Sequence, residues 1–155
     1  MKVTAFIGSS RKKFSYKACE TLFEHLKSYG NIDCEIVRLS EYNLRICSGC
    51  KSCIDKGEEF CPLNDDRDLL IQKIEQSDGI VFASPNYSFH VSGYMKVFLD
   101  RFGYLFHRPR YFGKTSTSIV AQGIYGGKKI IKYFNFIGNA LGFNVVPGAC
   151  IKTLE

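Results

Sequence analysis

The 155-residue sequence has no hydrophobic run long enough to cross a membrane. A membrane-spanning helix needs about 18 or more consecutive apolar residues, and no segment approaches that length. The first eight residues, MKVTAFIG, also lack the basic region and the apolar stretch of a signal peptide. We therefore expect a cytoplasmic protein with no membrane partner, in which the seven cysteines are reduced thiols or metal ligands.

Internal repeats and low-complexity linkers are absent as well, so we expect a single domain over residues 1–155. Hydrophobic residues make up 45% and charged residues 23%, the proportions of a globular domain with a buried core. The net charge is +6, but the basic clusters are scattered and no recognised nucleic-acid-binding motif accompanies them. We interpret the basic surface as solvated and expect no nucleic-acid partner.

Predicted strands and helices alternate along the whole sequence. This alternation predicts a parallel sheet with helices on both faces, a doubly wound α/β domain of five strands. The apolar run at 79–83 is expected at its centre. The predicted strands are 3–7, 34–39, 79–83, 115–121 and 144–146. The first predicted helix is capped by Ser15 and ends at about Ser28, and the second follows a cap at Asp65 or Asp66 and contains Leu69, Leu70 and Ile74. The third runs from Ser92 through Phe102, and the fourth from Lys128 to Leu141.

A domain of this kind usually closes with a helix after the fifth strand, whereas this sequence ends at Glu155. We expect that final helix to be missing. Two explanations stay open: a shortened sequence, or a partner subunit that covers the same face.

The first strand leads into the loop Gly8-Ser9-Ser10-Arg11-Lys12-Lys13-Phe14-Ser15. Ligands of open α/β sheets bind at the carboxyl ends of the strands, and a helix that starts there favours an anion. The loop has neither the second glycine of a Walker A motif nor the dinucleotide fingerprint G-x-G-x-x-G. A phosphate monoester therefore suits it better than a triphosphate or pyrophosphate. The alternative is an ordinary strand–loop–helix junction.

Two further loops are expected at the same edge. Ser84-Pro85-Asn86-Tyr87-Ser88 follows the central strand and offers polar groups and a ring to a flat aromatic ligand. The fourth strand ends in Gln122-Gly123-Ile124-Tyr125-Gly126-Gly127. Each could be an ordinary turn. Three loops that converge at one edge predict a pocket.

On these residues the sequence resembles the NAD(P)H-dependent FMN reductases of the flavodoxin-like superfamily. The segments that carry the resemblance are the GSSR loop, SPNYSFHVSGYMKVFLDR and AQGIYGG. The resemblance implies strand order 2-1-3-4-5, FMN as cofactor and NAD(P)H as co-substrate. It also implies a homodimer or higher homo-oligomer, and no catalytic side chain, because the flavin carries the redox step. In particular, Ser9, Arg11 and Ser15 would grip the phosphate. The cofactor-binding residues are expected to be Ser9, Ser10, Arg11, Lys13, Phe14, Ser15, Pro85, Asn86, Tyr87, Ser88, Gly123, Ile124 and Tyr125.

Four cysteines between the second strand and the next helix, Cys47, Cys50, Cys53 and Cys61, form C-x2-C-x2-C-x7-C. The first three spacings, and a proline directly after Cys61, match runs that bind [4Fe–4S] clusters. Zinc sites generally separate two C-x2-C hooks by a longer stretch. We predict that the loop at about 46–62 binds a metal cluster. Three alternatives for these cysteines remain open: free thiols or a lost cluster, a zinc site, and, as the last choice, a disulfide. Cys19, Cys34 and Cys150 are expected to be small buried residues.

The cysteine run extends the resemblance to the iron–sulfur flavoproteins, in which a compact cysteine motif near the flavin holds a [4Fe–4S] cluster. The resulting hypothesis is an FMN-dependent oxidoreductase that exchanges electrons with a small-molecule or protein redox partner, such as a ferredoxin-like protein. The alternatives are a cluster-free NAD(P)H:FMN or quinone reductase and a non-enzymatic electron carrier. The aromatic and basic stretch at 104–112 would cover the flavin, form a subunit contact or guide a nicotinamide phosphate.

Overall fold

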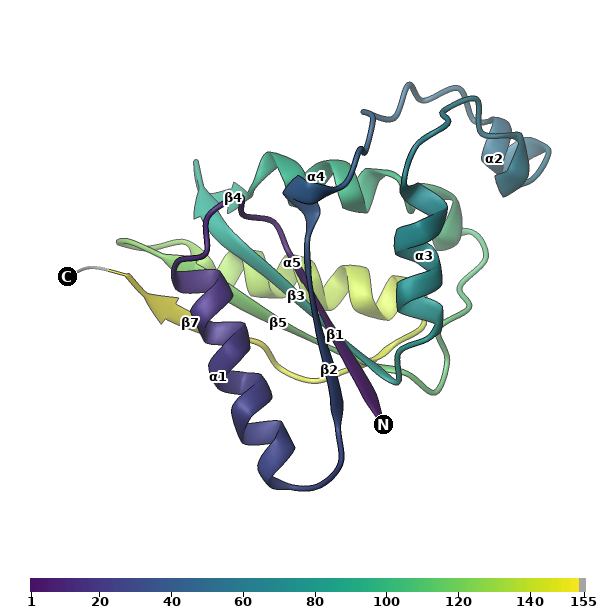
Figure 1. Cartoon of the computed structure of the whole chain (residues 1–155). Coiled ribbons are helices and arrows are strands. Elements are labelled where there is room, and N and C mark those ends of the chain that lie inside the picture. Colours follow the sequence, from purple (N-terminus) through teal and green to yellow (C-terminus); the bar gives the residue numbers. More distant parts are fainter. Residues whose placement is uncertain (154–155) are drawn as a thin grey trace.

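Strands and helices alternate along residues 1–153, the part of the chain that the computed structural model describes (Figure 1). The parallel strands follow the order β2-β1-β3-β5-β6, with β7 beside β5 and β4 antiparallel to β3. The parallel α/β sheet is confirmed, but it has seven strands and not five. The strands are β1 (Lys2–Ile7), β2 (Asp33–Arg38), β3 (Gly79–Tyr87), β4 (His90–Val91), β5 (Thr115–Gln122), β6 (Asn144–Val145) and β7 (Ala149–Lys152).

The longer helices are α1 (Phe14–Ser28), α3 (Arg67–Glu75), α4 (Gly93–Asp100) and α5 (Gly127–Leu141). The short α2 (Ser52–Asp55) and the 3-10 turns η1 (Leu39–Glu41), η2 (Glu58–Phe60) and η3 (Gly103–Phe106) lie in connections. No helix of the described residues combines the length and the apolar character that crossing a membrane would need.

The predicted fifth strand is divided in two by Pro147 and Gly148. The amide of Val146 still donates to Ser116 O at 2.8 Å, but Pro147 has no amide hydrogen with which to continue the ladder. Gly148 then passes so close to β5 that a Cβ there would lie 2.5 Å from Ser118 O. Pairing resumes at β7, which follows β5 from Ile119 onwards. The sequence pattern showed the first part of this strand and not the second.

The two faces of the sheet are covered by different helices. On one face Phe6, Phe82 and Phe134 belong to a large core under α3, α4 and α5. On the other face Val3, Ala5 and Ile7 pack with Cys19 and Phe23 of α1. Figure 1 shows α1 and α5 on opposite sides of the sheet. The predicted helices on both faces are confirmed, because residues of β1 alternate between these two cores.

Two details of the predicted helices are wrong. Helix α1 begins at Phe14 after Lys13, so Ser15 lies inside its first turn and does not cap it. Helix α4 ends at Asp100, although Phe102 beyond it is still buried. The predicted start of this helix at Ser92 is confirmed: Ser92 is the N-cap of α4, and its Oγ accepts from the amide of Met95.

Candidate functional site

The first loop leaves β1 at a position where only glycine fits. A Cβ on Gly8 would lie 2.5 Å from Ser92 Oγ and 2.8 Å from Met95 Cβ. The amide of Gly8 donates to Ala83 O at 2.8 Å, and the hydroxyl of Ser92 donates to Gly8 O. The ends of β1 and β3 and the start of α4 are therefore locked together beneath this loop.

The loop then presents an anion site at the start of α1. Ser9 is buried, and its Oγ accepts from the amide of Arg11 at 3.2 Å. No side chain caps α1 and its first turn has no acidic residue, so its leading amides have no competing carboxylate. With Arg11, Lys12 and Lys13 beside them, these amides suit a phosphate.

The second loop is tied to the first by a side-chain hydrogen bond. Arg11 Nη2 donates to the hydroxyl of Tyr87 at 3.0 Å, and Arg38 donates to Ser10 O at 3.1 Å. The hairpin between β3 and β4 turns on Ser88 and Phe89, both with left-handed φ values of 50° and 63°. Non-glycine residues adopt such values at a cost, and strained turns concentrate at functional sites.

The third loop is tied to the second. Asn86 Nδ2 donates to Tyr125 O at 2.8 Å, and the rings of Phe89 and Tyr125 stack at 5.0 Å between centroids. The side-chain oxygen of Asn86 is buried and has no hydrogen-bond partner among residues 1–153. A buried acceptor of this kind is costly unless a ligand or water supplies a donor.

The structure thus brings the three predicted loops together at one edge of the sheet. Figure 1 shows the carboxyl ends of β3 and β5 close to the β4 hairpin. Tyr87, Ile124 and Tyr125 are exposed there, whereas Ser9 and Ser15 are buried. Phe89 and the strand-end lock at Gly8 and Ser92 were not predicted. The only sequence signal for Phe89 was an aromatic residue directly after a predicted turn.

The cysteine loop projects beyond α3 and α4 (Figure 1). Cys47 and Cys50 are exposed, Cys53 and Cys61 are half-buried, and all four are free thiols. Burial, followed by the neighbouring charges of Cys61 and Cys47, raises the pKa of Cys53. Hydrogen bonds of Ser52 lower the pKa of the exposed Cys50.

The predicted four-cysteine metal site is therefore not assembled. Within residues 1–153 no three side chains of cysteine, histidine, aspartate or glutamate are close enough to hold a metal ion. Gly49 and Lys51, on either side of Cys50, have left-handed φ values of 68° and 61°. The loop thus has unusual backbone conformations on both sides of Cys50, and its four thiols are not gathered around one point.

Two arginines, the buried Arg67 and the exposed Arg110, attach the cysteine loop to the body of the domain. Arg67 Nη2 donates to Glu58 O at 2.9 Å, and Arg110 pairs with the Glu58 carboxylate. Tyr104 lies between them, with its ring centre 5.5 Å from the Arg67 guanidinium and 5.8 Å from that of Arg110. The hydrogen bond from Arg110 lowers the pKa of Glu58, so this pair is charged at neutral pH. The stretch at 104–112 thus packs against the cysteine loop, a contact that was not predicted.

The three remaining cysteines differ from one another. Cys19 is fully buried, and burial followed by the charge of Glu20 raises its pKa to about 12. Cys34 and Cys150 are half-buried, so the prediction that all three are buried holds fully only for Cys19.

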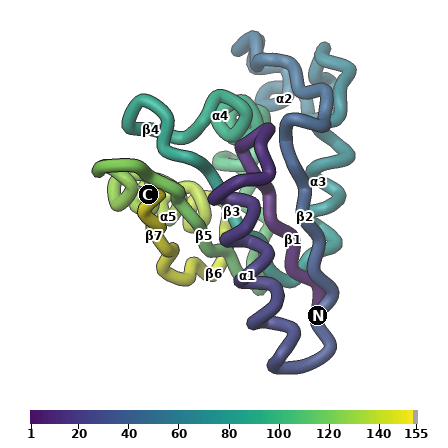
Figure 2. The backbone as a smooth tube through the Cα atoms, turned by 60° about the vertical axis from the view of Figure 1, so that its left-hand side comes forward, coloured from purple at the N-terminus to yellow at the C-terminus, as the bar shows by residue number. Residues whose placement is uncertain are grey.

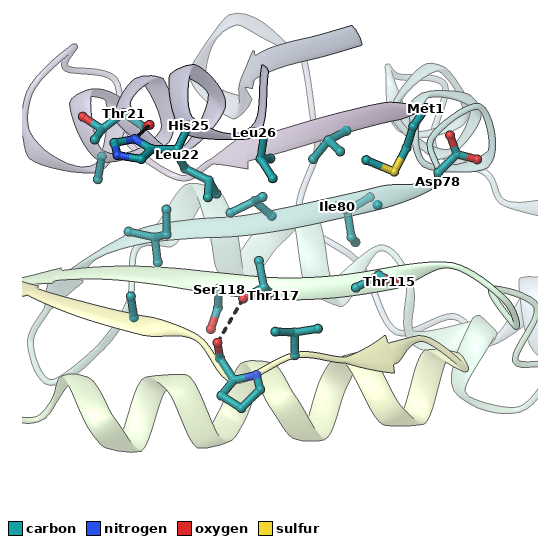
Figure 3. A pocket seen from close by; sticks show the side chains of 18 of the residues that line it. Met1, Thr21, Leu22, His25, Leu26, Asp78, Ile80, Thr115, Thr117 and Ser118 are labelled. Carbon is teal, nitrogen blue, oxygen red and sulfur yellow. Dashed lines mark hydrogen bonds between the residues drawn. The ribbon is translucent and has the colours of Figure 1, made fainter. Parts of the chain in front are cut away.

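An apolar groove of about 930 Å³ lies on the α1 face of the sheet (Figure 3). Leu22 and Leu26 of α1 form one wall, and Pro147, whose carbonyl accepts from Thr117 Oγ1, lies on the other. None of the predicted site residues lines it. Its position on a face and its lack of converging polar groups separate it from the loops at the strand ends, which are the better candidate site.

The chain is similar to known proteins of one family. The sequence model of the NADPH-dependent FMN reductase family matches residues 1–152. An iron–sulfur flavoprotein of Archaeoglobus fulgidus is 35% identical over 96% of this chain and 71% of the relative.

Two solved structures share the flavodoxin-like fold at low sequence identity. RosB with a bound 8-demethyl-8-formylriboflavin-5'-phosphate intermediate has a TM-score of 0.81 at 14% identity, covering 100% of this chain and 66% of RosB. An NAD(P)H:quinone oxidoreductase of Methanothermobacter marburgensis has a TM-score of 0.75 at 16% identity, covering 100% and 86%.

Proposed function

The chain belongs to the NADPH-dependent FMN reductase family, a family of oxidoreductases, and we propose that it holds FMN across the three loops at the carboxyl edge of its sheet. The observation that carries this proposal is the pair of hydrogen bonds that join the loops, from Arg11 to Tyr87 and from Asn86 to Tyr125. They turn three separate strand ends into one continuous site.

In this proposal the phosphate lies at the start of α1. The uncapped amides of the helix and the Arg11 side chain bind its oxygens, with Ser9, Ser10 and Ser15 as hydroxyl groups nearby. Lys13 and Phe14 form the junction between loop and helix. Arg11 already faces the second loop through Tyr87, so one side chain connects the phosphate end to the ring end.

Residues of the second and third loops would hold the flavin ring. They are Pro85, Asn86, Tyr87 and Ser88 of the second loop and Gly123, Ile124 and Tyr125 of the third. The unpartnered oxygen of Asn86 supports this placement, because a flavin carries a ring N–H that can satisfy a buried acceptor. The exposed rings of Tyr87 and Tyr125 offer surface for stacking.

When bound, FMN would supply hydride acceptance from NAD(P)H and the release of single electrons, and a [4Fe–4S] cluster would supply single-electron transfer. The residues of this chain would bind and orient the flavin. We propose that a small-molecule or protein acceptor receives the electrons, and that the working form is a homo-oligomer.

We further propose that the cysteine loop binds the cluster. The donor set fits in chemistry: the loop carries four free thiols, and Cys61 Sγ lies 3.7 Å from Nη2 of the buried Arg101. Cluster sites rarely exist fully formed without their metal, so binding would draw the four thiols together. The name of the Archaeoglobus fulgidus relative supports the same assignment.

A cluster-free reductase is the second candidate. It is favoured by the unassembled cysteine group of the described residues and by the fold shared with an NAD(P)H:quinone oxidoreductase. Iron and acid-labile sulfide in anaerobically reconstituted protein separate the two. Four iron atoms per chain are expected for a cubane cluster, and absence of both elements leaves the cluster-free reductase.

Flavin binding is tested by titrating the flavin-free protein with FMN and following flavin fluorescence. Arg11→Gln removes a charge-assisted hydrogen bond worth about 1.5–3 kcal/mol, so FMN should bind about 10- to 100-fold more weakly. Lys132→Gln removes an equal charge from the exposed side of α5 and serves as the matched control. Equal affinity of the two variants would contradict the phosphate site.

A further inference from the structure

Arg101 directly follows α4, and its buried guanidinium contacts the cysteine loop at Cys61. Its Nη1 donates to Arg45 O at 3.0 Å and pairs with Asp65. Its Nη2 lies 3.7 Å from Cys61 Sγ, within hydrogen-bond range of a sulfur acceptor. The Arg101 side chain is 2% exposed and that of Asp65 is 0% exposed, so water does not screen these contacts.

The direction of the guanidinium is fixed by Asp65. Asp65 also accepts from the amide of Arg45 at 2.9 Å and from the amide of Arg67 at 3.1 Å. The carboxylate is therefore held at three points. Because it engages one nitrogen of Arg101, the other nitrogen is left directed at Cys61.

A buried ion pair is weak evidence for a purely stabilising role, since apolar side chains of similar volume often stabilise a fold equally well. The third contact, to sulfur, is what an apolar pair would not supply. Hydrogen bonds to the sulfurs of an iron–sulfur cluster are among the factors that set its reduction potential. A donor stabilises the reduced state more, because reduction adds negative charge to the cluster and its thiolates.

We propose that Arg101 is a positioning residue of the cluster site: oriented by Asp65, it donates to the sulfur of Cys61 and raises the reduction potential of the cluster held there. This inference rests on the proposed function. The reduction concerned is the uptake of one electron by the oxidised cluster, in which no bond forms or breaks. Dithionite supplies that electron in the experiment below, and the flavin supplies it in the proposed function.

The experiment is a dithionite titration of the anaerobically reconstituted full chain with FMN bound. The cluster is followed by electron paramagnetic resonance, and iron and sulfide are measured in every sample. In Arg101→Gln the ratio of reduced to oxidised cluster at a fixed potential should fall about tenfold, which corresponds to about 59 mV for one electron. Arg101→Lys, which keeps the cation, should recover part of this change. The flavin titrates in the same sample and should be unchanged.

Arg110→Gln is the matched control. It removes the same charge from a side chain that also holds the cysteine loop, through Glu58, but that has no sulfur contact in the described structure. A general loosening of the loop would shift the cluster in both variants. A shift in Arg101→Gln alone is the expected result.

The outcomes are separable. Wild-type protein without iron and sulfide would refute the proposed cluster itself. A wild-type cluster that titrates at the same potential in Arg101→Gln would overturn the role of Arg101. If Arg101→Gln assembles no cluster, Arg101→Lys decides, because it keeps the cation beside Asp65 and removes the second nitrogen that reaches Cys61. A fall in potential supports the inference, and an unchanged potential overturns it.

Discussion

Replacement of Gly8 by alanine tests whether the strand-end lock positions the first loop. The new methyl group would lie 2.5 Å from Ser92 Oγ, 2.8 Å from Met95 Cβ and 3.3 Å from the Met95 amide nitrogen. Two of these atoms belong to the backbone or the first carbon of a helical residue and cannot rotate away. Ser92 is also held, because its hydroxyl donates to Gly8 O and accepts from the Met95 amide.

Overpacking of this kind costs about 1–3 kcal/mol. We therefore expect Gly8→Ala to lower the free energy of unfolding by that amount. Because the displaced loop carries the phosphate-binding groups, the affinity for FMN should fall as well. Gly93→Ala is the matched control: it lies one residue after Ser92, has open space around a Cβ, and should leave stability unchanged or raise it by up to about 1 kcal/mol.

The assays are urea unfolding followed by circular dichroism and FMN titration followed by fluorescence. If Gly8→Ala unfolds at the same urea concentration as wild type and binds FMN equally well, the lock does not exist as described. If Gly93→Ala loses as much stability as Gly8→Ala, the effect is a general one of the α4 start, and the close approach at Gly8 does not cause it.

Three further predictions concern other parts of the molecule. Asp65→Ala leaves the buried Arg101 cation without its carboxylate and should cost about 3–5 kcal/mol in urea unfolding at neutral pH. Burial raises the pKa of Asp65, but hydrogen bonds, led by the one from Arg101, outweigh burial and lower it. The stability that Asp65 contributes is therefore present above about pH 4 and is lost as pH falls through the lowered pKa. This loss should be missing from the acid dependence of Asp65→Ala. Gly127→Ala would place a methyl group 2.7 Å from Gln122 Oε1 and against Cys150, so weaker FMN binding is expected in the same titration, and unchanged binding would remove the third loop from the site. In iron-free native protein, alkylation followed by mass spectrometry should modify exposed Cys50 first and Cys19 only after unfolding; early modification of Cys19 would contradict its burial.

The sequence predicts the parts of this fold that burial dictates. The strands β1 and β3 are largely apolar because both of their faces are covered, whereas β5 mixes β-branched residues with small ones. The predicted ranges of all three differ from the structure mainly at the ends. The split of the last strand depends on how closely Gly148 approaches Ser118, a contact between segments that no local pattern reveals. The start of α1 was misplaced because Ser15 has the chemistry of a cap without being used as one.

The candidate site, too, could be predicted from the sequence only in part. Three loops at one edge follow from the alternation of strands and helices, since parallel strands end together. The contacts that join them follow from side-chain direction, which spacing does not fix. Arg101 is separated by 36 residues from Asp65 and by 40 from Cys61, so their meeting emerges only from the folded chain. Cysteine spacing likewise predicts a ligand set but not the loop conformation that would gather it.

The apolar groove on the α1 face is the alternative location for FMN. By size alone it would hold a flavin, and it lies between α1 and β7 rather than at the strand ends (Figures 2 and 3). The two locations involve separate stretches of the backbone. The loops are residues 8–14, 84–89 and 122–127, whereas the groove depends on residues 18–26 and 146–151.

Amide hydrogen exchange with and without FMN, read by mass spectrometry, tests the central claim most directly. Binding at the strand ends should slow exchange in peptides that cover 8–14, 84–89 and 122–127, and leave 18–26 and 146–151 unchanged. Protection confined to 18–26 and 146–151 would place the flavin in the apolar groove and contradict the account.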